Sequence, residues 1–211
     1  MYRLLIGVAR FLCKILLRLE VKDRENVPEK GPLLVVFNHT ASLDTLLLTV
    51  LPLGTVSFGA YAHRFNVFLL VWKALGKLIL VKRGKVDRKA LRAASGVLES
   101  GGVLLISPEG TRTTGALIRA KSGAAYLALK SGGIPLLPIG IEGTKGSLGR
   151  MLRLKRPRVT IRIGKIFTLT VPTGLPRAVD LREVTDGQIM PQIVALLPRE
   201  EMHGYYKRQP N

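Results

Sequence analysis

A histidine and an aspartate, His39 and Asp44, lie five positions apart in the stretch NHTASLD, residues 38–44. On one ideal helix the two side chains would point about 140° apart, at roughly 100° per residue. They can meet only if His39 lies on a turn and Asp44 lies in the first turn of the helix that follows. An aspartate bonded to one ring nitrogen would fix the tautomer and leave the other nitrogen to take a proton, as a general base does. The alternative is that His39 is a structural turn residue and Asp44 a helix cap.

The flanking sequence predicts such a corner. Residues 33–37 are five consecutive apolar residues behind a Gly-Pro pair, which is the pattern of a buried strand. A polar cluster rich in cap-forming residues and then three leucines, residues 46–48, predict the start of a helix. Corners of this kind often carry binding and catalytic residues. No serine is needed here as a nucleophile, because the hydroxyl of a substrate could serve.

A second polar cluster, residues 107–113, follows another apolar strand. Gly110 lets the backbone approach a ligand closely. Arg112 can bind a phosphate through two hydrogen bonds, and Thr111 can add a hydroxyl contact. The carboxylate of Glu109 could hold Arg112 or accept hydrogen bonds from substrate hydroxyls. The alternative is a polar loop at the end of a strand with a local Glu–Arg pair.

Arg83 comes just after the apolar strand predicted for residues 78–81. A cation at the carboxyl end of a strand in an α/β sheet is a plausible anion ligand. The alternative is an arginine on the solvated surface.

The composition indicates one α/β domain with many tight turns, since 47% of the 211 residues are hydrophobic and 22 are glycines. One cysteine and three widely separated histidines predict no internal disulfide and no metal site. The formal net charge of +19 favours a polyanionic partner. With 6% aromatic residues and no stacking motif, nucleic acid is a weaker candidate than an anionic membrane surface or a phosphorylated substrate.

The chain divides into three predicted parts. Residues 1–20 form an amphipathic helix in the membrane interface, because its charges recur too often for a spanning helix; the alternative is a helix packed on the domain with its basic stripe in water. Residues 21–200 form the domain, and residues 201–211 are a polar tail. Within the domain, the apolar residues 65–75 could be core, a second element touching the membrane, or a wall of an acyl-chain tunnel. The basic run of residues 145–165 is a surface facing lipid head groups or water.

Three blocks stand in one order along the chain: His39-x4-Asp44, the strand that leads to Arg83, and Pro-Glu-Gly-Thr-Arg at residues 108–112, before an Ile-Pro-Leu-Leu-Pro-Ile strand. This set resembles the glycerolipid acyltransferase family, most closely the bacterial 1-acyl-glycerol-3-phosphate acyltransferases, over roughly residues 25–170. The resemblance implies a fold like that of glycerol-3-phosphate acyltransferase, an α/β domain with a central mixed, largely parallel sheet flanked by helices.

The resemblance also implies roles for individual residues. His39 is the base that deprotonates the acceptor hydroxyl, and Asp44 orients it. The residues implied around the glycerol-phosphate acceptor are Arg83, Glu109, Gly110 and Arg112. Two positions depart from the family pattern, Ala41 where a serine is frequent and Ser107 where a phenylalanine is usual, and they leave the identity of the acceptor open.

The reaction implied is transfer of a fatty acyl group from a thioester, acyl-CoA or acyl carrier protein, to 1-acyl-glycerol-3-phosphate, which gives phosphatidic acid in phospholipid biosynthesis. Backbone N–H groups near the helix after His39 are candidates to bind the oxyanion. No cofactor and no nucleic acid partner are expected, and the predicted location is the cytoplasmic face of the cell membrane, as a peripheral or monotopic protein. One alternative is the same chemistry on glycerol-3-phosphate, another lysophospholipid or a glycolipid. The other is a non-catalytic basic protein that binds membranes or nucleic acid.

Overall fold

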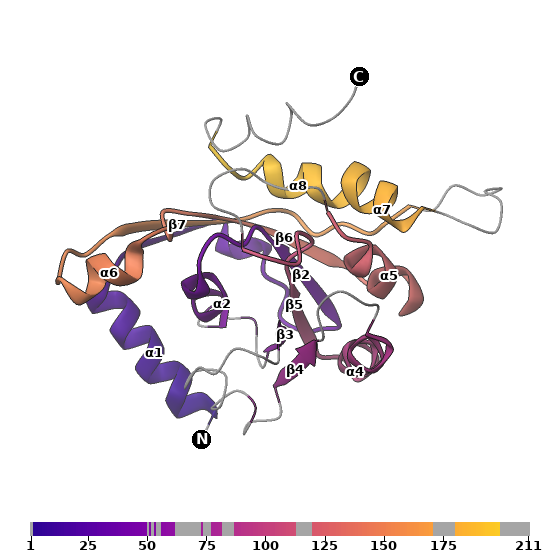
Figure 1. Cartoon of the computed structure of the whole chain (residues 1–211), viewed down its shortest axis with the longest axis horizontal. Coiled ribbons are helices and arrows are strands. Elements are labelled where there is room, and N and C mark those ends of the chain that lie inside the picture. The colour runs from indigo at the N-terminus through magenta and orange to yellow at the C-terminus, as the bar shows by residue number, and fades with distance from the viewer. Residues whose placement is uncertain are drawn as a thin grey trace.

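The apolar stretch before His39 is the central strand of a seven-stranded sheet in the computed structural model of the chain (Figure 1). The structure describes residues 2–49, 51, 53, 56–61, 73, 77–81, 87–112, 120–170 and 180–198. The strands are β1 Arg18–Lys22, β2 Leu33–Phe37, β3 Val56–Tyr61, β4 Leu78–Val81, β5 Val103–Ile106, β6 Leu136–Glu142 and β7 Arg158–Ile163.

The order of the strands across the sheet is β1-β7-β6-β2-β5-β3-β4. Neighbouring strands run parallel except for β6 and β7, which are antiparallel. The predicted mixed, largely parallel sheet is therefore confirmed. Because β2 and β5 are parallel neighbours, their carboxyl ends lie at the same edge of the sheet, with Val36 opposite Ile106.

Helices cover both faces of the sheet (Figure 1). They are α1 Tyr2–Leu16, α2 Ser42–Thr49, α4 Arg88–Glu99, α5 Gly123–Lys130, α6 Ser147–Leu152, α7 Leu181–Val184 and α8 Met190–Val194, with a 3-10 turn η1 Arg24–Asn26 and a π-helical turn η2 Thr185–Ile189. Among the described residues, no helix is long and apolar enough to cross a membrane.

The two faces of β2 belong to different cores, because successive side chains of a strand point in opposite directions. Leu33, Val35 and Phe37 pack in the core that contains residues of α1 and α2. Leu34 and Val36 pack in the core that contains residues of α4, α5, α7 and α8. All five side chains are buried, which explains why the strand is an unbroken apolar run rather than an alternating pattern.

The predicted N-terminal helix is too long by four residues. It ends at Leu16, and residues 18–22 form the edge strand β1, which pairs in parallel with β7. Leu19 and Val21 alternate with charged residues and pack against the core, as in a half-buried strand. The apolar helix pattern just before them hid this alternation in the sequence. Arg18 pairs with Arg158, which lies 140 positions further along the chain. A local sequence pattern therefore cannot indicate this pairing.

Candidate active site

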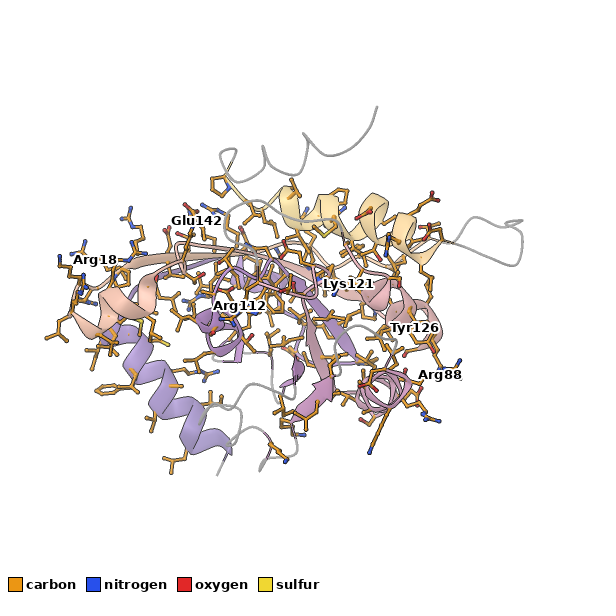
Figure 2. The ribbon with its side chains drawn as sticks, in the orientation of Figure 1. Arg18, Arg88, Arg112, Lys121, Tyr126 and Glu142 are labelled. Carbon is orange, nitrogen blue, oxygen red and sulfur yellow. The ribbon has the colours of Figure 1, made fainter. Side chains whose placement is uncertain are left out.

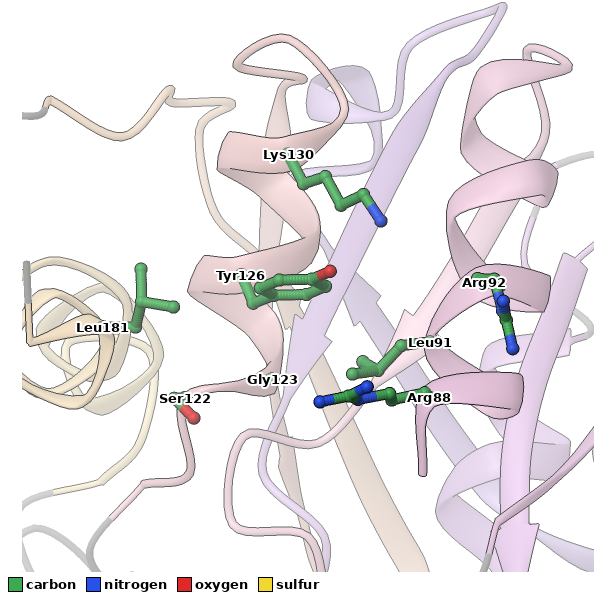
Figure 3. A pocket seen from close by; sticks show the side chains of 8 residues that line it. All are labelled: Arg88, Leu91, Arg92, Ser122, Gly123, Tyr126, Lys130 and Leu181. Atoms are coloured by element: carbon green, nitrogen blue, oxygen red, sulfur yellow. The ribbon is translucent and has the colours of Figure 1, made fainter. Parts of the chain in front are cut away.

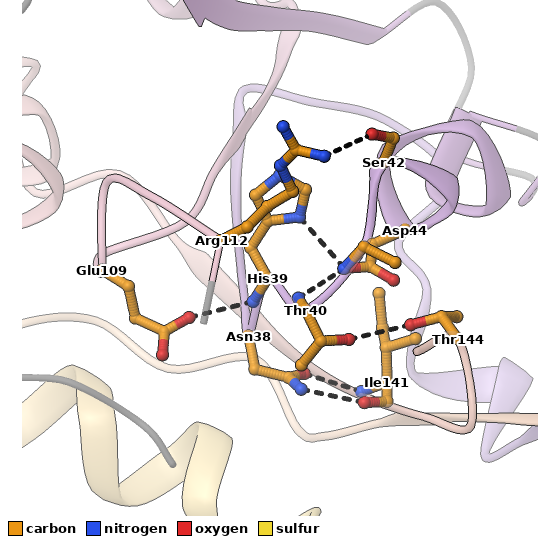
Figure 4. Close-up of polar contacts among 10 residues, drawn as sticks. Asn38, His39, Thr40, Ser42, Asp44, Glu109, Arg112, Ile141 and Thr144 are labelled. Carbon is orange, nitrogen blue, oxygen red and sulfur yellow. Dashed lines mark hydrogen bonds and ion pairs between the residues drawn. The ribbon is translucent and has the colours of Figure 1, made fainter. Parts of the chain in front are cut away.

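His39 and Asp44 meet at the corner between β2 and α2, as the spacing predicted (Figure 4). His39 lies on the turn and Asp44 is the third residue of α2. The distance between His39 Nδ1 and Asp44 Oδ2 is 3.0 Å. The Asp44 side chain is fully buried, whereas that of His39 is 20% exposed, so the ring can be reached from outside the domain.

The same oxygen of Asp44 accepts two further hydrogen bonds, from the backbone N–H groups of Thr40 at 2.7 Å and Ala41 at 2.7 Å. These bonds fold the turn around the carboxylate at the start of α2, where a negative charge is favourable. Asp44 is therefore both a capping residue and the partner of His39. The two interpretations of the pair that the sequence left open are compatible, because one atom does both.

The contact with Asp44 determines what His39 can do. A carboxylate accepts hydrogen bonds, so the ring donates from Nδ1–H and its lone pair lies on Nε2. The ring also contacts Phe37 edge to face, with 5.7 Å between the ring centroids. The geometry at this corner suits a general base whose charged form is stabilised by the buried aspartate.

Glu109 approaches the same turn from the loop after β5. Its Oε2 accepts a hydrogen bond of 2.9 Å from the backbone N–H of His39, and its side chain is fully buried. The carboxylate thus holds the main chain of the histidine, a role that the sequence did not predict. Its predicted contact with the acceptor stays a prediction.

The rest of this loop places a cation beside the histidine. Arg112 Nη1 donates to the hydroxyl of Ser42 at 2.8 Å, which brings the guanidinium across to the first residue of α2 (Figure 4). Thr111 is partly exposed in the same loop. Arg83, the other cation predicted to bind the acceptor phosphate, lies outside the described residues, as do nearly all of residues 65–75.

The backbone conformation of Gly110 favours glycine, and this residue also lies against the flexible end of the Lys121 side chain. Its φ of 63° is in the left-handed region, and a Cβ placed there would lie 2.8–3.0 Å from the end of the Lys121 side chain. Lys121 is itself anchored, because its backbone N–H donates to the carbonyl of Pro108 at 2.8 Å. Lys121 is thus a second cation at this loop that sequence reasoning missed, since a lysine just before a predicted helix has no distinctive local signal.

Two polar residues on the central strand and its turn were also missed. Asn38 is buried and makes two hydrogen bonds of 2.8 Å with the backbone of Ile141, one to its N–H and one to its carbonyl. The hydroxyls of Thr40 and Thr144 are 2.8 Å apart. These contacts join the turn after β2 to the end of β6 and to the residues that follow it, just after the Ile-Pro-Leu-Leu-Pro-Ile block.

A cavity of about 370 Å³ lies between α4 and α5, away from this corner (Figure 3). Arg88, Arg92 and Lys130 give it a positive lining, and Lys130 Nζ is 5.4 Å from the centre of the Tyr126 ring. It contains none of the residues around His39. Within the part of the chain that the structure describes, no three His, Cys, Asp or Glu side chains are grouped so as to hold a metal ion.

The family described as Acyltransferase matches residues 18–142, more than half of the chain. The match includes His39, Asp44, Glu109, Arg112 and Lys121, and Thr144 lies just beyond it. The chain belongs to the acyltransferase family. It is 31% identical over 166 residues to the probable 1-acyl-sn-glycerol-3-phosphate acyltransferase of Mycoplasma pneumoniae, covering 75% of this chain and 60% of that protein. It is 32% identical over 149 residues to the mouse 1-acyl-sn-glycerol-3-phosphate acyltransferase alpha, covering 65% of this chain and 49% of that protein.

The fold of this acyltransferase is also that of a solved structure. The crystal structure of the 1-acyl-sn-glycerophosphate acyltransferase PlsC from Thermotoga maritima matches all of this chain and 83% of that one, with a TM-score of 0.65 and 22% sequence identity. The chain spans about half to three fifths of the length of the curated relatives given above.

Proposed function

We propose that this acyltransferase moves a fatty acyl group from a thioester to the free hydroxyl of 1-acyl-glycerol-3-phosphate and so makes phosphatidic acid. The observation that carries the proposal is the buried Asp44 bonded to His39 Nδ1, with Arg112 brought to the same corner. The names of the two relatives support this acceptor.

His39 acts as the base. Nε2 takes the proton of the acceptor hydroxyl as the oxygen attacks the thioester carbonyl, and Asp44 stabilises the imidazolium that forms. The proton then leaves with the thiol of the donor. The donor is acyl-CoA or acyl carrier protein, and no cofactor takes part.

Arg112 binds the phosphate of the acceptor, because a guanidinium offers paired donors to phosphate oxygens. Arg83, by resemblance, and Lys121, by its place beside Gly110, add positive charge to the same site. Glu109 keeps the histidine main chain in position and, by resemblance, lies near the glycerol group. Binding of the phosphate holds the acceptor hydroxyl beside the base, so that the reaction between them becomes effectively unimolecular.

The enzyme works at a membrane, as a peripheral or monotopic protein on the cytoplasmic face. Its acceptor has an acyl chain and belongs to the bilayer. α1 exposes apolar side chains, including Leu4, Phe11 and Ile15, and the chain as a whole is strongly positive, so a surface of anionic lipid suits both features.

The test is an assay in detergent or liposomes with a long-chain acyl-CoA and lysophosphatidic acid, which follows phosphatidic acid for the wild type and His39→Ala. Turnover of His39→Ala should be lower by about 10²–10⁴, with an unchanged urea unfolding midpoint as the control for folding. Near-normal activity of the variant would contradict the scheme. If neither protein makes product, acyl carrier protein and a panel of other acceptors follow, and failure of all of them would favour a non-catalytic role.

A further inference from the structure

Exposed apolar side chains gather on two elements of the described structure. Of the ten large hydrophobic residues that are exposed, five lie on α1 and three on α6 and the turn after it. Leu148 is 61%, Leu152 80% and Leu154 79% exposed. Soluble monomers rarely gather so many apolar side chains in water without a partner for them.

The segment around α6 is also strongly basic. Between residues 143 and 158 there is no acidic residue, and the cations are Lys145, Arg150, Arg153, Lys155, Arg156 and Arg158. All six side chains are exposed. Arg18 lies at this end of the molecule too, where β1 pairs with β7 (Figure 2).

The α6 segment is attached to α1. Arg156 Nη2 donates to the carbonyl of Lys14 at 3.1 Å and lies 3.4 Å from that of Leu17, at the carboxyl end of α1. Met151 turns inward and packs against the core that contains Ile6 and Cys13 of α1. The two elements are therefore joined, and both expose apolar side chains.

The α6 segment is also attached to the catalytic corner. It joins the carboxyl end of β6 to β7, and since β6 is parallel to β2, it begins at the edge of the sheet where His39 lies. The hydrogen bond between the hydroxyls of Thr40 and Thr144 links the residue after His39 to the start of this connection.

We propose that residues 147–156 insert into an anionic phospholipid bilayer as a second anchor beside α1 and hold the carboxyl edge of the sheet at the membrane. Leucines surrounded by cations suit the boundary between acyl chains and anionic head groups. A second copy of this chain, with the same positive charge, suits the segment poorly. The inference rests on the proposed function only in the role it gives this anchor, which is to present a lipid acceptor to His39. Membrane insertion itself can be measured without an activity assay.

The first experiment places an environment-sensitive nitrobenzoxadiazole label on Leu152→Cys. The native thiol, Cys13, is replaced by alanine so that only the new cysteine is labelled; it is buried, and burial raises the pKa of its thiol. Vesicles of phosphatidylglycerol and phosphatidylcholine should shift the emission to the blue, and spin-labelled acyl chains should quench it. The matched control is a label on Gln192→Cys, exposed on α8 across the sheet from α1, which should show neither change.

The second experiment removes the anchor with the triple variant Leu148→Ser, Leu152→Ser and Leu154→Ser. Its partition onto the same vesicles should be at least about tenfold weaker, while its turnover on a short-chain, monomeric lysophosphatidic acid stays unchanged. A label at position 152 that stays in water on vesicles that bind the protein would overturn the proposal. Unchanged partition of the triple variant onto vesicles would also overturn it. A dimer of the wild type without lipid that the triple substitution dissociates would overturn it too, because the leucines would then bind a second copy of the chain.

Discussion

Asp44→Asn separates the electrostatic role of this residue from its structural one. Three donors converge on Asp44 Oδ2: the ring of His39 and the backbone N–H groups of Thr40 and Ala41. Asparagine has nearly the same shape and can leave its carbonyl oxygen in that place. The turn then keeps its hydrogen bonds, and the imidazolium that forms during the reaction loses the negative charge beside it.

The magnitude follows from the distance. Two unit charges 3.0 Å apart interact by about 5.5 kcal/mol at an effective dielectric constant of about 20. This is an upper bound, because asparagine still accepts a hydrogen bond that contributes about 1 kcal/mol. We expect turnover of Asp44→Asn to decrease by about 10²–10⁴, and the free energy of unfolding to change little.

Asp44→Ala should behave differently. It leaves the N–H groups of Thr40 and Ala41 without their acceptor, and each unsatisfied buried group costs about 1–3 kcal/mol. Stability should therefore fall by about 2–6 kcal/mol in addition to the loss of activity. Initial rates of phosphatidic acid formation and urea unfolding of both variants measure the two effects.

The matched control is Asp87→Asn, since Asp87 also caps a helix, accepting from the backbone N–H of Ala90 at 3.1 Å. Its turnover should equal that of the wild type. The reasoning is refuted if Asp44→Asn keeps more than about a third of wild-type turnover, or if it destabilises the protein as much as Asp44→Ala does.

Three further substitutions test the surroundings of the base. Arg112→Ala should raise the KM for lysophosphatidic acid by about tenfold or more with a smaller change in kcat, and an unchanged KM would argue against a phosphate contact. Gly110→Ala should cost about 1–2 kcal/mol of backbone strain and also raise this KM, because the new Cβ displaces the Lys121 side chain. Gly101→Ala, with a φ of 76° and open space around its Cβ, should cost only the strain. Equal kinetics of the two variants would show that the contact with Lys121 does not affect the acceptor. Asn38→Ala should lower the free energy of unfolding by about 2–4 kcal/mol, because both backbone groups of Ile141 lose a buried partner, and a loss below 1 kcal/mol by urea unfolding would show that the bonds are replaced.

The fold was predictable where the sequence pattern was local. The strand before His39, the strand at residues 78–81 and the strand before residue 107 all lie where their apolar runs placed them. The edge strand β1 was not predictable, because its neighbour among the described strands is β7, far along the chain, and its five residues come just after an apolar helix. The short helix α6 was hidden for a related reason, since its leucines face outward and leave no buried stripe.

The contact between His39 and Asp44 was predictable, because two residues five positions apart can meet only where a turn leads into a helix. The supporting contacts were not. Glu109 was expected to bind a substrate hydroxyl or Arg112, which stays a prediction, and the hydrogen bond that its carboxylate accepts from the backbone N–H of His39 was not predicted. Such a contact depends on the register of β2 and β5, which brings two turns 70 positions apart against each other.

The positions of these bonds limit where the oxyanion can be stabilised. The backbone N–H groups of His39, Thr40 and Ala41 all donate to buried carboxylates, so they hold the base and are not available to the reacting carbonyl. The next N–H groups along the chain belong to Ser42 and Leu43, at the start of α2, where helix N–H groups have no carbonyl partner in their own helix. Arg112 already reaches Ser42 through its hydroxyl. A carbonyl placed against the start of α2 would therefore meet the positive end of the helix and the guanidinium of Arg112 together.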